Sequence, residues 1–109
     1  PIARARVRAV AAVIACDVHP VNNLSVLRRL KAMGHAQPAI DEWIRHWIVE
    51  GLRAVEAMIE DGPFCFGSAP GLADVYLVPQ LYNARRFSTP LDAFPRVLAA
   101  EAACLALPA

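Results

Sequence analysis

The sequence lacks closely spaced cysteine pairs and any long run of charge of one sign. Its three cysteines, Cys16, Cys65 and Cys104, are widely spaced without a Cys-x-x-Cys pair, which argues against a disulfide framework and a zinc site. The histidines also lack metal-ligand spacing, so we predict no metal. Eleven basic and ten acidic residues give a formal net charge of +1. This balance gives no reason to expect a nucleic-acid partner.

Apolar runs of the length that a bilayer requires are absent too. A membrane span needs about 20 apolar residues, and charged residues interrupt every segment here. The opening arginines followed by "AVAAVIAC" look like a signal peptide at first sight. Asp17 and His19 follow, however, without a small-residue cleavage site. We therefore predict no membrane span, no targeting peptide and a cytoplasmic location.

Alternation of apolar and polar residues, the mark of a half-buried strand, occurs nowhere in the chain. Helical periodicity predicts helices from Ile2 to about Val18, from Leu24 to near Gly34, from Pro38 to Asp61, from Gly71 to Phe87, and after Pro95. With 109 residues, 57% of them hydrophobic, the chain predicts one all-α helical bundle domain over residues 1–109.

Individual side chains on these helices carry further expectations. Trp43 and Trp47 lie on the apolar stripe of the longest helix and should be core residues, whereas His46 lies on its solvent side. The apolar residues of the next helix lie on all its sides, which predicts a helix enclosed by others; they are Leu72, Val75, Tyr76, Leu77, Val78 and Leu81. Asp74, in the first turn of that helix, is expected to cap it; a general base is the weaker alternative. Cys16 should be a small buried apolar group.

Polar and helix-breaking residues interrupt the apolar pattern in "CDVHPVNNLSVL", residues 16–27. Proline removes a backbone donor, and asparagine competes for backbone hydrogen bonds, so Pro20, Asn22 and Asn23 are poor choices for a helix that only packs. Pro20 should kink or restart the helix. The two asparagines either satisfy backbone groups freed by Pro20 or face a ligand.

Three blocks, "HPVNNLSVL", "FCFG" and "PGLADVYLVPQLYNARRF", resemble the C-terminal domain of zeta-class glutathione transferases, the family of maleylacetoacetate and maleylpyruvate isomerases. The resemblance runs in order through nearly the whole chain. It implies an all-α glutathione transferase C-terminal-like bundle. Gly71 stands where the family usually has Ser or Thr, which removes the side-chain half of the helix cap and keeps the Asp74 half.

The resemblance also implies partners and a reaction. Family members carry a thioredoxin-like N-terminal domain with a Ser-Ser-Cys type motif, which these residues do not contain, and they are usually homodimers. Glutathione thiolate adds to the cis double bond of a dicarboxylate, the single bond rotates, and elimination returns the trans isomer. We therefore expect glutathione as cofactor, no catalytic residue in this fragment, and no turnover by the fragment alone.

Site residues follow from the same resemblance. His19 and Asn23 become candidate glutathione ligands, and Asn22, Ser25 and Arg86 become candidate substrate ligands. Some bacterial relatives have an arginine at the position of Ser25, and serine offers a carboxylate only one weak contact. Arg86 could instead form an ion pair with a nearby carboxylate, and its neighbour Arg85 is expected on the surface or in a salt bridge.

Other functions remain open from the sequence. A general detoxifying glutathione transferase, such as a haloacid dechlorinating enzyme, would differ mainly in its substrate. A non-catalytic helical interaction domain on the same scaffold would lack the reaction altogether.

Overall fold

The computed structural model describes residues 1–108, and those residues contain helices and no strand, which confirms the all-α prediction. The elements follow the order α1 (Ile2–Ala12), a π-helix η1 (Val13–Val18), α2 (His19–Val21), α3 (Leu24–Ala32), α4 (Gln37–Met58), α5 (Leu72–Arg86) and α6 (Pro95–Leu105).

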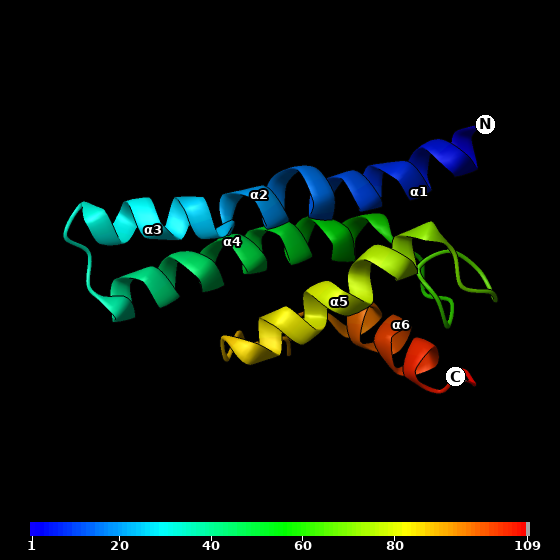
Figure 1. Cartoon of the computed structure of the whole chain (residues 1–109). Helices are drawn as coiled ribbons and strands as arrows, with labels where there is room; N and C mark the ends of the chain where they lie inside the picture. Colours follow the sequence, from blue (N-terminus) through cyan, green and yellow to red (C-terminus); the bar gives the residue numbers. More distant parts are fainter. Residues whose placement is uncertain (109) are drawn as a thin grey trace.

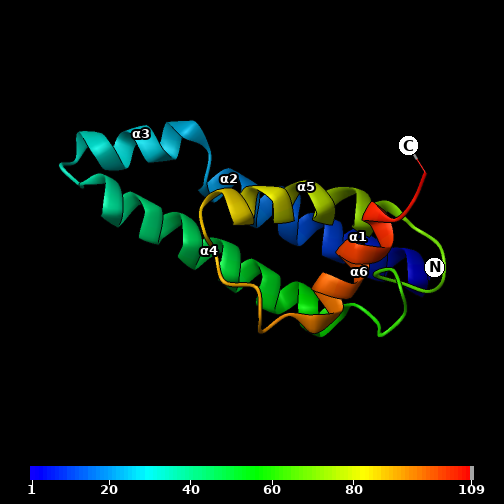
Figure 2. The same ribbon diagram turned by 90° about the horizontal axis from the view of Figure 1, so that it is seen from below.

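The long helix α4 organises the bundle (Figure 1). The series from α1 to α3 runs antiparallel along it, α6 packs against it, and α5 packs against α1, η1 and α6. Figure 2 shows α5 lying over α1 and η1, so that α3 and the start of α4 extend beyond the rest. The molecule is elongated, with principal extents of 47 × 27 × 26 Å.

The core forms around the apolar stripe of α4, as its helical period predicts. Ile44, Ile48 and Leu52 are at most 2% exposed. Apolar side chains from the other helices close over this stripe, among them Val10, Ile14, Val18, Leu77, Leu81 and Val97.

Pro20 distorts the first helical stretch on both sides. Ahead of it the helix widens, and the His19 N–H donates to the Ile14 carbonyl, five residues back. Beyond it, Asn22 and Asn23 N–H groups donate at 3.2 Å to the carbonyls of His19 and Pro20. Asn23 then adopts extended backbone, and α3 begins at Leu24. The restart at Pro20 was predicted from the sequence, but the π-helix was not.

Helix α5 is not enclosed by other helices, so that prediction was wrong. Leu72, Val75, Tyr76 and Tyr82 are between 40% and 76% exposed. The opposite face of α5, with Leu77 and Leu81, is fully buried. The sequence makes both faces of α5 apolar, but the other helices of this chain bury only one of them.

Two smaller expectations were also wrong. Cys16 is exposed, because it lies on the outward side of η1. Trp47 is 36% exposed at the edge of the α4 stripe, where its ring packs edge-on against Trp43 and His46. Trp43 is half-buried against the core, and His46 is exposed as predicted.

One helical stretch, Ile2–Ala32, is long and apolar enough to cross a membrane by length and composition, which the sequence analysis had excluded. Core helices of soluble proteins meet the same criterion. Val10, Ile14 and Val18 in this stretch are buried against other helices, although only 22% of its most apolar window is buried.

The close contact between α4 and η1 depends on Gly51. A Cβ atom at this position would lie 2.1 Å from Cγ2 of Val18 and 3.5 Å from its Cβ. We expect Gly51→Ala to lower the free energy of unfolding by about 1–3 kcal/mol, because overpacking outweighs the better helix propensity of alanine. Urea denaturation measures this change.

Two further variants isolate the steric cause. Ala54→Gly, at an exposed position in the same helix, measures propensity alone, at about 1 kcal/mol. In a Val18→Ala background the Gly51→Ala step should become neutral or stabilising. A Gly51→Ala variant more stable than the parent with Val18 intact would contradict this account.

Candidate functional site

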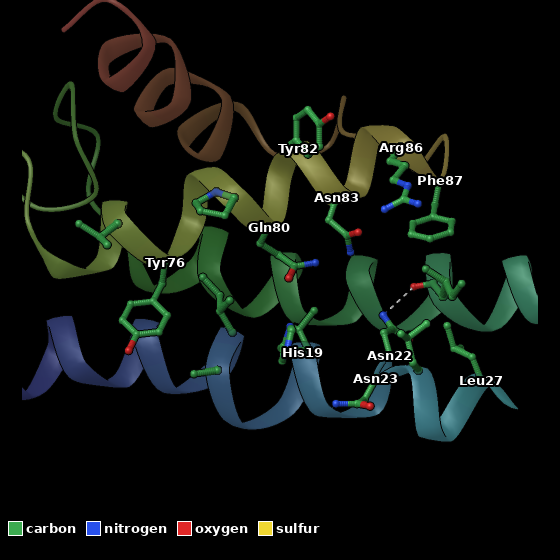
Figure 3. Close-up of a pocket in the computed structure, with 17 residues that line it drawn as sticks. His19, Asn22, Asn23, Leu27, Tyr76, Gln80, Tyr82, Asn83, Arg86 and Phe87 are labelled. Atoms are coloured by element: carbon green, nitrogen blue, oxygen red, sulfur yellow. Dashed lines mark hydrogen bonds between the residues drawn. The ribbon is translucent and has the colours of Figure 1, made fainter. Parts of the chain in front are cut away.

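A pocket of about 950 Å³ lies between α5 and the distorted segment from η1 to the start of α3 (Figure 3). Ile44 of α4 also lines it. The lining carries the polar side chains of His19, Asn22, Asn23, Gln80, Asn83 and Arg86, together with the hydroxyl groups of Tyr76 and Tyr82. No Asp or Glu of the described residues lines it. Amide groups and one cationic guanidinium therefore set its chemistry, which suits an anionic, oxygen-rich ligand.

Helix α5 supplies one wall through regular spacing. Tyr76, Gln80, Asn83 and Phe87 recur every three or four residues, so they share one face of the helix. All four line the pocket. Figure 3 shows Gln80 and Asn83 pointing from α5 toward His19 and Asn22.

Asn22 joins the opposite wall to α4. Its Nδ2 donates to the Ile44 carbonyl at 3.3 Å, 22 residues away. The indole Nε1 of Trp43 donates to the Val21 carbonyl, also at 3.3 Å. These two bonds hold the non-helical segment after Pro20 against α4. The Oδ1 atom of Asn22 is buried and has no hydrogen-bond partner.

Asn23 caps α3. Its Oδ1 accepts from the Ser25 N–H at 3.0 Å and from the Ser25 Oγ at 3.2 Å. The bond with the Ser25 N–H is a cap of α3 and does not satisfy the backbone groups freed by Pro20, and the Asn23 side chain still lines the pocket. Ser25 is exposed and is not in the lining. The structure brings His19, Asn22, Asn23 and Arg86 together in the pocket and leaves Ser25 outside it.

The adjacent arginines of α5 have different surroundings. Arg85 forms an ion pair with the largely buried carboxylate of Glu101, and this hydrogen bond raises the pKa of the guanidinium. Arg86 lines the pocket, and its guanidinium carbon lies 5.7 Å from the centroid of the Phe87 ring. Within residues 1–108, no carboxylate lies within 4 Å of Arg86. The alternative of an ion pair for Arg86 is not observed there.

Gln80 and Asn83 are pocket residues that the sequence analysis did not identify. Gln80 is 6% exposed, and its Nε2 has no hydrogen-bond partner. The available signal was a glutamine among apolar residues on α5, four positions after Tyr76. The helical face defined by Tyr76 and Phe87 would have included both residues.

Asp74 lies outside the pocket and organises the start of α5. Its Oδ2 accepts from the Gly71 N–H at 2.9 Å, and its Oδ1 accepts from the Cys65 N–H at 3.0 Å. Gly71 has no side chain, so only the carboxylate half of a capping box is present. Asp74 is 3% exposed and does not line the pocket, which leaves it no access to a ligand there as a general base.

The two cysteines beside Asp74 are poor nucleophiles. Burial, followed by the hydrogen bond and negative charge of Asp74, strongly raises the pKa of the Cys65 thiol. Burial and the charge of Asp74 also raise the pKa of Cys104, whose Sγ lies 3.8 Å from Asp74 Oδ1. Residues 1–108 hold no group of three His, Cys, Asp or Glu side chains placed to bind a metal ion.

Comparisons with known proteins agree with the fold. The sequence model of the family "Glutathione S-transferase, C-terminal domain" matches residues 37–100. Maleylacetoacetate isomerase from Pseudomonas aeruginosa is 56% identical over 97 residues, which cover 89% of this chain and 46% of that protein. Maleylpyruvate isomerase from a Ralstonia species is 45% identical over 106 residues, covering 93% and 50%.

A solved structure gives the same result. Maleylacetoacetate isomerase from Anaeromyxobacter dehalogenans, with dicarboxyethyl glutathione and citrate in its active site, superposes with a TM-score of 0.89 at 45% identity. The match covers 95% of this chain and 47% of that one. The chain spans about half the length of the curated relatives it matches.

Removing the Asp74 carboxylate should destabilise the fold. Asp74→Ala leaves two backbone N–H groups without their acceptor, and we expect a loss of about 2–4 kcal/mol in the free energy of unfolding. Asp74→Asn keeps the shape and one acceptor oxygen and should lose less. Asp92→Ala, at an exposed carboxylate, is the control. Equal stability of the Asp74→Ala and Asp92→Ala variants would rule out the anchoring role.

Thiol labelling should follow exposure and pKa. Because only the thiolate reacts, a raised pKa keeps a thiol protonated and slow at pH 8. With iodoacetamide and peptide mapping by mass spectrometry, we expect fast labelling of Cys16, slower labelling of Cys104, and labelling of Cys65 only after unfolding. Labelling of Cys65 in the native protein as fast as Cys16 would contradict the buried arrangement.

Proposed function

The chain belongs to the glutathione S-transferase C-terminal domain family, and on that premise we propose that it is the helical half of a glutathione-dependent cis-trans isomerase. The substrate would be maleylacetoacetate or maleylpyruvate. The observation that carries the proposal is the acid-free pocket with a cationic Arg86 at α5 and amide groups on both walls. A dicarboxylate requires such a lining, since each carboxylate needs donors and no competing negative charge.

Each pocket residue has a role in this proposal. Arg86 binds one carboxylate of the substrate through its guanidinium, which forms no ion pair with a carboxylate of residues 1–108. Asn22 contacts the substrate from the facing wall, held in place by its bond to Ile44. Ser25 is left out of the substrate site, because it lies outside the lining.

Glutathione fits the wall that His19 and Asn23 form. The Asn23 Oδ1 is occupied by Ser25, so its NH₂ group is the part available to donate to an oxygen of the tripeptide. The imidazole of His19 is exposed and lines the same wall. When bound, glutathione supplies the nucleophilic thiol of the reaction. The residues of this chain bind and orient it.

The remaining partners belong to the same proposal. The matched relatives are about twice as long as this chain, which supports a thioredoxin-like domain in the rest of the protein. The exposed apolar face of α5 offers it a packing surface. A homodimer rests on the family resemblance, and a cytoplasmic location is carried over from the sequence analysis.

The role of Arg86 is tested in the full-length protein with maleylpyruvate. Arg86→Ala should lower kcat/KM about 100-fold, mostly through KM, because a carboxylate loses its charged partner. Arg86→Lys should be intermediate, since lysine keeps the charge and loses bidentate geometry. Arg28→Ala, an exposed arginine of α3 outside the pocket, is the matched control.

Two results would count against this assignment. If the parent protein isomerises maleylpyruvate no faster than glutathione alone does, the proposed function is ruled out. An active parent with an unchanged Arg86→Ala variant removes only the carboxylate role of Arg86.

A further inference from the structure

Two buried polar atoms of the pocket residues have no partner, and they are chemically complementary. Gln80 presents an amide donor, Nε2, and Asn22 presents an amide acceptor, Oδ1. Among the side chains of residues 1–108, one more buried atom lacks a partner, Thr89 Oγ1, and its residue is outside the lining. A buried polar group without a hydrogen bond costs stability, so a pair of them in one pocket indicates a ligand that satisfies both.

The orientation of the Asn22 amide is fixed. The Ile44 carbonyl can only accept, so the NH₂ of Asn22 faces it and Oδ1 is the atom left without a partner. Gln80 lies on the opposite wall, more than nine-tenths buried. Figure 3 shows its side chain reaching from α5 toward the wall that carries His19 and Asn22.

We infer that Gln80 and Asn22 recognise the 1,3-diketone part of the substrate. Gln80 Nε2 donates a hydrogen bond to a ketone oxygen, and Asn22 Oδ1 accepts a hydrogen bond from the hydroxyl group of the enol form. This inference rests on the proposed function. Maleylacetoacetate and maleylpyruvate each carry two ketones in a 1,3 relation between terminal carboxylates. Such a diketone enolises, which gives one acceptor and one donor.

A ketone fits this position better than a carboxylate does. A buried carboxylate needs several donors or a cation to offset its lost hydration, and one amide does not provide them. A neutral ketone oxygen is satisfied by one N–H. The cationic group of the pocket is the exposed Arg86, where a terminal carboxylate keeps contact with water.

The spacing along α5 agrees with this division. Gln80 and Arg86 are six residues apart, which is about 9 Å along a helix axis. A chain of several carbons between a ketone and a terminal carboxylate spans such a separation. Arg86 therefore determines that the ligand is an acid, and Gln80 with Asn22 determines that it is a diketone.

Removing the amide of Gln80 has opposite effects on stability and recognition. Methionine is nearly isosteric and apolar, so Gln80→Met deletes a buried unsatisfied donor and should raise the Tm of the unliganded protein. If the Gln80 amide instead made a hydrogen bond that stabilises the fold, Gln80→Met would lower the Tm. The matched control is Gln37→Met, because Gln37 is exposed at the start of α4 and its side chain donates to Asp41 there.

The experiment uses the full-length protein, with glutathione present. KM for maleylpyruvate is measured beside inhibition constants for acetylpyruvate, a stable 1,3-diketo acid, and for maleate, a dicarboxylate without a ketone. In Gln80→Met we expect KM and the inhibition constant for acetylpyruvate to rise about tenfold, because the ketone oxygen loses one hydrogen bond and is left unsatisfied. The maleate constant should stay within twofold, and Gln37→Met should match the parent in all three.

The contrary results are distinguishable. Suppose that the parent is active. The diketone role is then overturned, and the proposed function is left intact, if Gln80→Met has an unchanged inhibition constant for acetylpyruvate, an equal rise in the inhibition constant for maleate, or a lower Tm. A rise in the calorimetric Kd for glutathione alone would assign Gln80 to the tripeptide and also overturn it. A parent without isomerase activity overturns both proposals.

Discussion

The missing N–H of Pro20 is the constraint on which the pocket depends. An α-helix cannot run regularly through this residue, so the chain widens into a π-helix before it and opens after it. The opening turns His19, Asn22 and Asn23 toward α5 instead of leaving them on a continuous helix surface.

Contacts with α4 hold this irregular segment in place. Gly51 lets η1 approach closely enough for Val18 to be buried. Two hydrogen bonds connect α4 to the turn after Pro20. Asn22 donates to the Ile44 carbonyl of α4, and Trp43 of α4 donates to the Val21 carbonyl. The far end of the bundle is fixed separately, since Glu56 accepts from the N–H groups of Arg96 and Val97 at the start of α6. A rigid scaffold therefore surrounds a locally irregular site.

Helix α5 shows what the sequence could and could not predict. Its bounds and its cap by Asp74 follow from local chemistry that the sequence contains, and so does the main stripe of α4. The exposure of Val75 and Tyr82 could not be predicted, because it depends on which faces this chain covers. Gln80 was missed for a related reason: its place in the pocket requires knowing that α5 faces the segment around Pro20.

The candidate ligands divide in the same way. Asn23 and Ser25 are neighbours in sequence, and the family resemblance suggested a ligand role for both. The structure joins them in a helix cap that leaves Asn23 on the pocket wall and Ser25 outside it. The partner of Arg85 is Glu101, sixteen residues away, which only the packing of α6 against α5 reveals.

The most direct test of the central claim is a crystal structure of the full-length protein with glutathione and maleate. The account predicts the dicarboxylate between α5 and the segment after Pro20, with one carboxylate bonded by the Arg86 guanidinium. Maleate bound elsewhere, or a guanidinium turned away from it, would contradict the assignment of this pocket to the substrate.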